Sequence, residues 1–421
     1  MKGKKQFQSI RGMRDLSGQE ARYFEYLCAV MQQYLHSHGY QPFHPPILEN
    51  TQLFSRSIGE GTDVVEKEMF TFDDHGDSLT MRPEGTAGIV RAVIENGLTF
   101  GTHKLWTAGP MFRRERPQKG RYRQFYQFSV EAFGIAEPEQ DAEQLLMMAD
   151  LWQTLGVAEH VKLHINSLAT AEVRDNYRQA LIDYFSAHAD KLDSDSQRRL
   201  HKNPLRILDS KNPKMQAVIG NAPKLSEYWD SVSEQHFKRV LACLQAAGVK
   251  YSIDDTLVRG LDYYNHTVYE WVTDQLGAQG TLCGGGRYDG LCEYIGGKAT
   301  PAVGFGLGID RTVLLMQAVS MLPETKPLAY FVLLGQAAKC QGLLLANQLR
   351  RALPQRQVIT HLADSGMKTQ FKKADQSRAE YAVIIGAEEL AGQQVSIKNL
   401  AEGSQQTVAF ADLIHFFNHQ Q

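Results

Sequence analysis

KLWTAGPMFRRERPQKGRYRQFYQFSVEAFG, residues 104–134, is the stretch that decides the architecture of this chain. Its composition favours two extended strands, 104–115 and 124–134, joined by the polar loop 116–123. Two strands joined by so short a loop pair antiparallel. We therefore expect an α+β domain built on an antiparallel sheet.

The same stretch concentrates charge and polar groups. Six cations stand between positions 113 and 123, opposed only by Glu115. They are Arg113, Arg114, Arg116, Lys119, Arg121 and Arg123. A solvated loop is the ordinary explanation of a charge run, but the flanking strands favour a site for a polyphosphate, an RNA backbone or both. On the second strand, period two places an aromatic, an amide and an acid on one face: Phe125, Gln127, Ser129 and Glu131.

Composition limits the class of protein. A chain of 421 residues exceeds one hydrophobic core and predicts two or three domains. The net charge of -2 excludes a global basic field, so a nucleic-acid partner must be held by local patches. Five cysteines without a CxxC pair favour reduced thiols in the cytoplasm, and no apolar stretch predicts a membrane span.

Outside the opening stretch, periodicity predicts helices at 18–38 and 86–96, and the residues DSLTM (77–81) before the second helix favour a strand. Strands alternating with helices near the C-terminus predict a small α/β domain with a mostly parallel sheet. The run GGGRY, 284–288, is expected to be a loop that lets backbone approach a ligand. The predicted segments are a first part of the core at 1–171, a helical insertion at 172–250, a second part of the core at 251–322 and a C-terminal α/β domain at 328–421.

Three stretches together resemble the class II aminoacyl-tRNA synthetases. GYQPFHPPIL (39–48) resembles motif 1, FRRE with RYRQF (112–125) resembles motif 2, and GFGLGIDRTVLL (304–315) resembles motif 3. Within that class, VRGLDYYN (258–265) and TLCGGGRYDGL (281–291) resemble the signatures of the histidyl-tRNA synthetases. The resemblance covers nearly the whole chain and is weakest over the helical insertion. The C-terminal module resembles that family's anticodon-binding domain, with cations at Lys368, Lys372, Lys373 and Arg378 on a predicted helix.

The resemblance implies ATP-dependent attachment of L-histidine to histidine tRNA through histidyl-adenylate, with Mg²⁺ carried by ATP and no metal held by protein ligands alone. It implies Arg259 and Arg113 as catalytic residues. The implied histidine-binding residues are Glu84, Gly85, Thr86, Arg113, Gln127, Glu131, Arg259, Tyr263, Tyr264 and Tyr288. The implied ATP-binding residues are Arg113, Glu115, Arg121, Phe125 and Arg311, and the implied tRNA contacts are Arg116, Gln118 and Arg123. Motif 1 normally builds a dimer interface, so the resemblance also implies a homodimer.

Other functions fit the residues less well. The glycines of GFGLG are spaced by two, which does not match the dinucleotide-binding pattern. A general RNA-binding protein leaves the paired tyrosines and the glutamates unexplained. A non-catalytic paralogue that binds histidine and regulates another enzyme remains the alternative, although such relatives typically lose the RGLDYY signature and the C-terminal module. The chain resembles the bacterial form of the histidyl-tRNA synthetases, but the stretch FYQFSVEAFG departs from that bacterial pattern at Tyr126 and Ser129.

Overall fold

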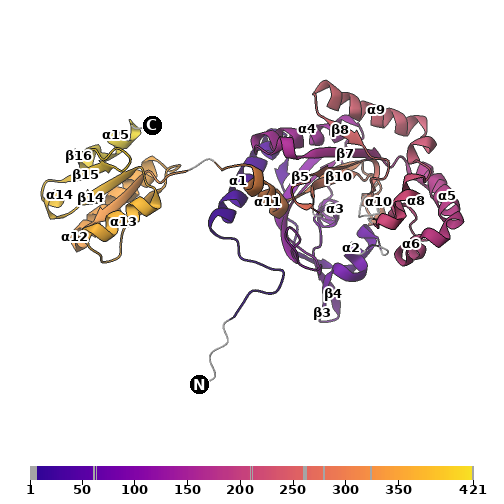
Figure 1. Cartoon of the computed structure of the whole chain (residues 1–421), viewed down its shortest axis with the longest axis horizontal. Coiled ribbons are helices and arrows are strands. Elements are labelled where there is room, and N and C mark those ends of the chain that lie inside the picture. The colour runs from indigo at the N-terminus through magenta and orange to yellow at the C-terminus, as the bar shows by residue number, and fades with distance from the viewer. Residues whose placement is uncertain are drawn as a thin grey trace, which may run out of the picture. The chain divides into compact units, whose positions relative to one another are not determined.

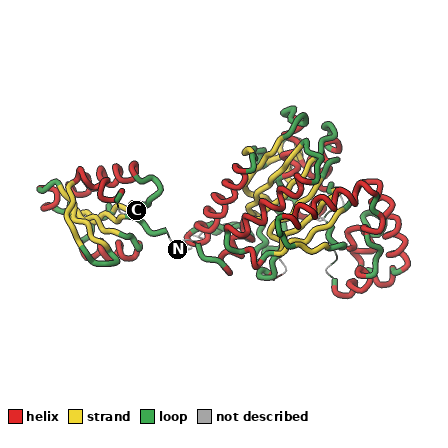
Figure 2. The backbone as a smooth tube through the Cα atoms, turned by 90° about the horizontal axis from the view of Figure 1, so that it is seen from above, coloured by secondary structure: helices red, strands yellow, loops and turns green. Residues whose placement is uncertain are grey.

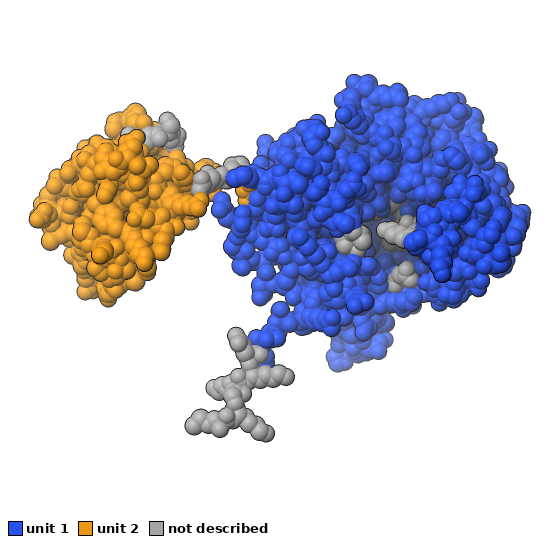
Figure 3. Space-filling model, viewed as in Figure 1, with its two compact units in different colours: residues 1–321 blue, residues 322–421 orange. Residues whose placement is uncertain are grey.

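The computed structural model divides the chain into two compact units, 1–321 and 322–421, which Figure 3 colours separately. Within the part of the chain that it describes, each helix is too short or too polar to cross a membrane. The described residues are 7–59, 62, 64–208, 210, 212–258, 263–277, 280–322 and 325–419.

An eight-stranded sheet forms the centre of the larger unit (Figure 1). Its five inner pairings are antiparallel and the pairing at each edge is parallel, which confirms the predicted antiparallel sheet. In spatial order the strands are β1 (Gln41–Pro42), β5 (His103–Phe112), β6 (Gln124–Phe133), β11 (Ala302–Gly308), β10 (Thr281–Arg287), β9 (Asn265–Val272), β7 (Lys162–Ser167) and β8 (Tyr251–Ile253).

The opening stretch forms β5 and β6, as predicted. They pair without a bulge from His103 opposite Phe133 to Phe112 opposite Gln124. Alternate residues of β6 face opposite sides of the sheet. Tyr126 packs its ring 5.1 Å from that of Phe24, whereas Glu131 on the other face accepts a hydrogen bond from Thr86.

Helices cover both faces of this sheet (Figure 2). On the Tyr126 face, α1 (Gly18–Ser37) contacts both α4 (Glu139–Thr154) and α11 (Ile309–Val319). Leu27, Met31 and Leu35 are buried at the three- and four-residue spacing that predicted helix 18–38. On the Glu131 face, α3 (Thr86–Glu95) buries Ile89, Val90 and Val93 in a cluster that includes Phe133.

A second sheet, of three strands, is formed by the chain segment that precedes α3. Its order is β2 (Leu48–Asn50), β4 (Asp77–Met81) and β3 (Phe70–Asp74), and α2 (Thr51–Ile58) packs against α3. The sequence predicted only the β4 strand of this sheet. The other two strands are short and mostly exposed, so their side chains lack the apolar alternation that marks a half-buried strand.

The segment after β7 is helical. Its first helices lie together at one end of the larger unit, whereas its last helix packs against α4 (Figure 1). Tyr177 and Phe185 of this segment share one buried cluster with Tyr264 and Tyr288, so its core is continuous with that of the sheet. The domain boundaries near 171 and 250 stay predictions. The helices are α5 (Ala171–Ala187), α6 (Ser194–Arg199), α7 (Leu205–Leu208), α8 (Gln216–Gly220) and α9 (Ser231–Ala246).

The smaller unit holds a five-stranded sheet. Two of its pairings are parallel and two are antiparallel, so the expectation of a mostly parallel sheet holds for half of it. The sequence missed β16, an edge strand with polar, exposed residues and hence no hydrophobic pattern. The strands in spatial order are β13 (Val358–Thr360), β12 (Ala329–Leu333), β14 (Tyr381–Ile385), β15 (Gln394–Asn399) and β16 (Gln405–Ala409). The helices are α12 (Gln336–Ala352), α13 (Met367–Ser377), α14 (Ala387–Ala391) and α15 (Leu413–Asn418).

One loop prediction is wrong in a way that matters for the site. The glycine-rich run before Tyr288 is an inner strand, β10, although glycine disfavours strands. A Cβ added at Gly285 would lie 2.2 Å from the backbone oxygen of Gly304 on β11. Glycine is therefore what allows these two strands to approach each other.

Candidate active site

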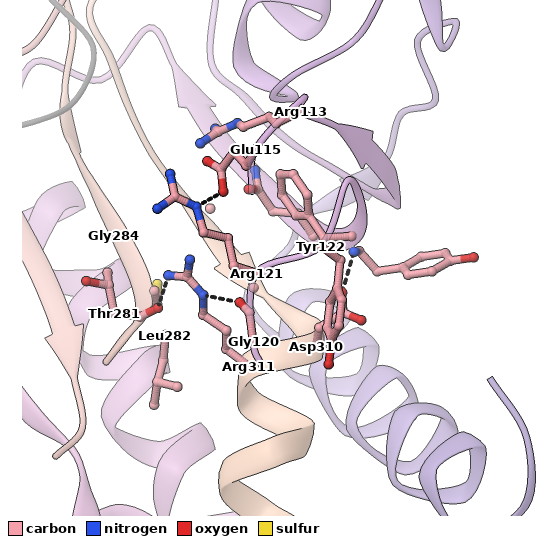
Figure 4. Close-up of a pocket in the computed structure, with 16 residues that line it drawn as sticks. Arg113, Glu115, Gly120, Arg121, Tyr122, Thr281, Leu282, Gly284, Asp310 and Arg311 are labelled. Atoms are coloured by element: carbon pink, nitrogen blue, oxygen red, sulfur yellow. Dashed lines mark hydrogen bonds and ion pairs between the residues drawn. The ribbon is translucent and has the colours of Figure 1, made fainter. Parts of the chain in front are cut away.

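A pocket of about 180 Å³ opens where β6, β10 and β11 meet the start of α11 (Figure 4). Its walls combine cations, three aromatic residues and residues of glycine-rich strands. The lining residues are Arg113, Glu115, Gly120, Arg121, Tyr122, Phe125, Tyr126, Gln127, Thr281, Leu282, Cys283, Gly284, Gly306, Gly308, Asp310 and Arg311. All five of the residues predicted to bind ATP are among them.

Three guanidinium groups, those of Arg113, Arg121 and Arg311, converge on one side of this pocket (Figure 4). Arg311 donates to the backbone oxygens of Gly120, at 2.9 Å, and Thr281, at 2.8 Å. Burial, together with the charges of Arg113 and Arg121, lowers the pKa of Arg311 to about 10. The group stays cationic at neutral pH, and the mutual repulsion of three cations favours a polyanionic ligand.

Two acids moderate this charge. Glu115 forms an ion pair with Arg121, and Glu68 lies 3.5 Å from the same guanidinium. Arg121 and Glu115, both of which the resemblance implies as ATP-binding residues, are thus paired with each other. Arg121 or Glu115 can bond fully to a nucleotide only if their ion pair breaks, or if the side chain bonds to its partner and to the nucleotide at the same time.

Phe125 supplies a flat wall. The guanidinium of Arg113 lies 5.4 Å from the centre of its ring, and Arg113 also donates to the backbone oxygen of Pro83 at 2.9 Å. A planar ligand stacked on such a ring gains dispersion and, from a neighbouring cation, electrostatic contacts.

The face of β6 continues from this pocket to a buried end at Glu131. Gln127 lines the pocket and donates to the Ser129 hydroxyl at 3.0 Å, and Glu131 follows on the same face. Phe125 and Glu131 are six residues apart, which corresponds to roughly 20 Å of strand. The predicted face of β6 therefore runs from the cationic pocket to the fully buried Glu131.

Glu131 is fully buried and bonded to two hydroxyl groups. Thr86 donates to one carboxyl oxygen at 2.7 Å and Tyr288 donates to the other. Burial raises the pKa of this carboxyl to about 8, despite the two hydrogen bonds that favour its ionised form. The site thus presents an acid that can hold or release a proton near neutral pH.

Three phenol rings close this buried end. The ring of Tyr263 lies 4.6 Å from that of Tyr264 and 5.5 Å from that of Tyr288. Burial raises the pKa of Tyr263 and of Tyr288 well above its ordinary value, so both remain neutral hydroxyls. The three tyrosines that the resemblance implies as histidine-binding residues therefore come from two segments of the chain.

Glu84, Gly85 and Thr86 form the entry to α3 beside Glu131. The buried carboxylate of Glu84 accepts from the backbone N–H of Thr86, at 2.7 Å, and from that of Ala87, at 2.9 Å. A Cβ at Gly85 would lie 2.2 Å from the Ser129 hydroxyl oxygen. Ser129, one of the two departures from the bacterial pattern, is thus packed directly against this turn.

The predicted tRNA residues lie on the loop between β5 and β6. Arg116 and Gln118 are exposed, whereas Arg123 is half-buried and donates to the backbone oxygen of Glu115 at 3.3 Å. In the smaller unit, Lys368, Lys372 and Lys373 are exposed on α13, and Arg378 is the residue that ends this helix. The catalytic prediction at Arg259 lies outside the described residues.

Several pocket residues were missed. Asp310, Cys283 and Gly306 all stand within the quoted motif stretches, which could have drawn attention to them, but no residue pattern singled them out. Arg287, beside the predicted Tyr288, is fully buried in an ion pair with Asp141 and supports the sheet. Among the described residues no group of three or more His, Cys, Asp or Glu side chains could hold a metal ion.

This combination of fold and site agrees with the comparisons to known proteins. A family model of histidyl-tRNA synthetases matches residues 12–312, and a model of the anticodon-binding domain matches residues 331–420. The apo histidyl-tRNA synthetase of S. aureus is 33% identical, with a TM-score of 0.81, over 98% of this chain and 100% of that chain.

Two further solved structures share the fold at lower identity. The histidyl-tRNA synthetase of Nostoc sp. is 21% identical over 99% of this chain and 100% of that one, with a TM-score of 0.71. An ATP phosphoribosyltransferase regulatory subunit/histidyl-tRNA synthetase of Bacillus halodurans is 22% identical over 92% and 100%, with a TM-score of 0.62. The match to an anticodon-binding domain does not favour the regulatory alternative. With both the synthetase region and the anticodon-binding domain matched, the chain belongs to the histidyl-tRNA synthetase family, whose aminoacyl-tRNA ligase activity uses ATP.

Proposed function

We propose that the face of β6 from Phe125 to Glu131 binds ATP and L-histidine end to end and joins them as histidyl-adenylate. The observation that carries this proposal is the contrast along one strand face. Three guanidinium groups gather at one end, and neutral, hydrogen-bonding side chains at the other. A polyphosphate needs the first environment and an imidazole the second.

In the first step, a carboxylate oxygen of histidine attacks the α-phosphorus of ATP. The bond from that phosphorus to the bridging oxygen of pyrophosphate breaks, and pyrophosphate leaves with the electron pair. Negative charge grows on the α-phosphate oxygens, where Arg113 acts as a fixed cation. Arg259 is the second proposed cation for this step, on the resemblance alone. Arg121 and Arg311 hold the outer phosphates.

The adenine ring stacks on Phe125, with Glu115 as the acceptor for its amino group. Mg²⁺ bound to the phosphates would further offset their charge. The carboxylates at the pocket suit it only as a passenger of ATP, because Glu115 is paired with Arg121 and Asp310 with Arg14.

At the buried end, the imidazole is read by an acid and by phenols. Glu131 accepts an N–H from one ring nitrogen, Tyr264 bonds to the other, and Tyr263 and Tyr288 exclude water. Glu84, Gly85, Thr86 and Gln127 surround the α-ammonium group. A substrate analogue without the matching nitrogen leaves buried polar groups unpaired, which is the basis of strong discrimination.

In the second step, a hydroxyl of the terminal ribose of histidine tRNA attacks the carbonyl carbon of the adenylate, and AMP leaves. Arg116, Gln118 and Arg123 contact the acceptor end, and the C-terminal unit binds the anticodon. A homodimer and a cytoplasmic location belong to the same proposal. The five free cysteines support a reducing compartment.

The test is histidine-dependent exchange of pyrophosphate into ATP, followed by charging of histidine tRNA. We expect exchange with L-histidine and none with the other amino acids. A protein that binds histidine in calorimetry but shows no exchange at saturating substrate would instead be a regulatory paralogue.

A further inference from the structure

The segment before α1 lies against the loop that connects β5 and β6. The backbone N–H of Arg123 donates to the oxygen of Gly12 at 2.8 Å. Gly12 has a φ of +89°, and a Cβ there would lie 2.7 Å from Pro117 and 2.9 Å from the Arg123 side chain. This close fit holds the N-terminal segment against the loop that carries two of the pocket's three cations, Arg113 and Arg121.

Arg14 extends this contact to the far side of the pocket. Its guanidinium forms an ion pair with Glu20 of α1 and donates to Asp310 of α11 at 2.7 Å. The same group lies 4.2 Å from the centre of the Tyr122 ring. Both Asp310 and Tyr122 line the pocket, whereas Arg14 does not.

Asp310 connects two further parts of the nucleotide site. Its second carboxyl oxygen accepts from the backbone N–H of Tyr126 at 2.6 Å (Figure 4). Tyr126 follows Phe125, and Asp310 precedes Arg311. The carboxylate therefore joins the start of β6 to the start of α11, and it is only 4% exposed. A buried carboxylate needs a countercharge, and Arg14 supplies one.

We propose that Arg14 is a positioning residue for the nucleotide: through Asp310 and Tyr122 it sets the place of Arg311 and Phe125. This inference rests on the proposed use of the pocket for ATP. Because Arg14 contacts neither substrate, its removal shifts the walls of the nucleotide end and leaves the Glu131 end intact. The expected signature is thus a selective loss of ATP binding.

The experiment compares Arg14→Gln and Arg14→Lys in the full-length protein by pyrophosphate exchange. We expect Arg14→Gln to raise the KM for ATP about tenfold, since small misplacements of positioning groups weaken productive binding. The KM for histidine should stay within about twofold. Arg14→Lys, which keeps the charge, should recover part of the loss. The double variant with Asp310→Asn should be less than additive.

Arg356→Gln is the matched control. Arg356 is a half-buried arginine paired with Glu380 at 2.7 Å, and it belongs to the smaller unit. It should change neither KM, because its ion pair lies in the other unit. If Arg14→Gln folds poorly, Tyr122→Leu tests the same contact. It removes the ring that packs against the Arg14 guanidinium and leaves no charge unpaired.

Two results would overturn the inference. One is an ATP KM within twofold of wild type in folded Arg14→Gln, or in Tyr122→Leu where Arg14→Gln does not fold. The other is a lowered melting temperature with both KM values unchanged, which would make Arg14 a structural residue only. Failure of the proposed function itself is distinguishable, because the wild-type protein would then show no exchange.

Discussion

The two ends of the β6 face differ in charge, exposure and internal bonding. At the nucleotide end, three arginines share a pocket with acids that only partly offset them, and Arg311 has a lowered pKa. At the Glu131 end, protein hydroxyls occupy both carboxyl oxygens, and the pKa of the acid is raised. The first end is organised to receive charge, and the second to receive a neutral or singly charged ring.

On the proposed assignment of the site, this difference explains how one strand serves two unlike substrates. Cations crowded without a ligand raise the free energy of the empty site, and binding of phosphates relieves it. Neutral groups bonded to each other lower the free energy of the empty site, so a ligand must replace those bonds. We therefore expect the nucleotide end to control the rate of adenylate formation. The buried end should control the selectivity for histidine.

The largest expected effect comes from Arg113→Gln. We expect the rate of adenylate formation to fall about 10²–10³-fold, because one fixed cation at the developing charge is lost. The readout is the kcat of pyrophosphate exchange. Its neighbour Arg114→Gln is the control: Arg114 is exposed, lies over Phe70 and does not line the pocket, so its variant should retain nearly full activity. Equal losses in both variants would mean that general charge, not position, matters.

A smaller effect is expected from Glu131→Gln at the buried end. Gln keeps the shape and can still bond to Thr86 and Tyr288, but its amide cannot ionise. It therefore cannot form the charge-assisted hydrogen bond that the carboxyl group makes with imidazole once it has released its proton. We expect the KM for histidine to rise about tenfold. The KM for ATP in the same assay is the internal control, and a matching rise there would contradict the separation of the two ends.

Gly304→Ala tests how tightly the buried end is packed. A Cβ at Gly304 would lie 1.6 Å from a carboxyl oxygen of Glu131 and 2.6 Å from the backbone oxygen of Val130. We expect a loss of about 1–3 kcal/mol in unfolding free energy. Thermal unfolding with and without histidine identifies the transition of the larger unit. Gly308→Ala on the same strand is the control, because its nearest neighbour is 3.4 Å away.

The pH dependence of stability tests whether the Glu131 carboxyl holds a proton in the folded protein. The pKa of Glu131 rises from 4.5 in the unfolded chain to about 8 in the folded protein. Between these values the folded state binds more protons, so stability falls as pH rises. We expect the melting temperature of wild type, relative to Glu131→Gln, to fall by up to about 10 °C across this range. If the melting temperature of wild type instead rose with pH relative to that of Glu131→Gln, the carboxyl would be ionised in the folded protein.

The sequence predicted the residues of the nucleotide end better than it predicted the strands that surround them. The period of two along β6 correctly placed Gln127, Ser129 and Glu131 on one face, because strand geometry alone dictates that alternation. The local pattern predicted a loop where β10 forms, because glycine is a weak strand former. The glycines of β10 are explained only by the close approach of β11. It also missed β16, whose polar residues carry no alternation.

Local residue patterns by themselves determined the strand pair at 104–134, the helices at 18–38 and 86–96, and the membership of the site's polar face. Only the tertiary structure decided which distant residues complete that site. Arg14 and Asp310 are 296 positions apart, and Tyr288 and Glu131 are 157 apart. Periodicity reports which side of an element is buried, whereas the pairing of two distant polar groups depends on how the elements pack and leaves no mark on local spacing.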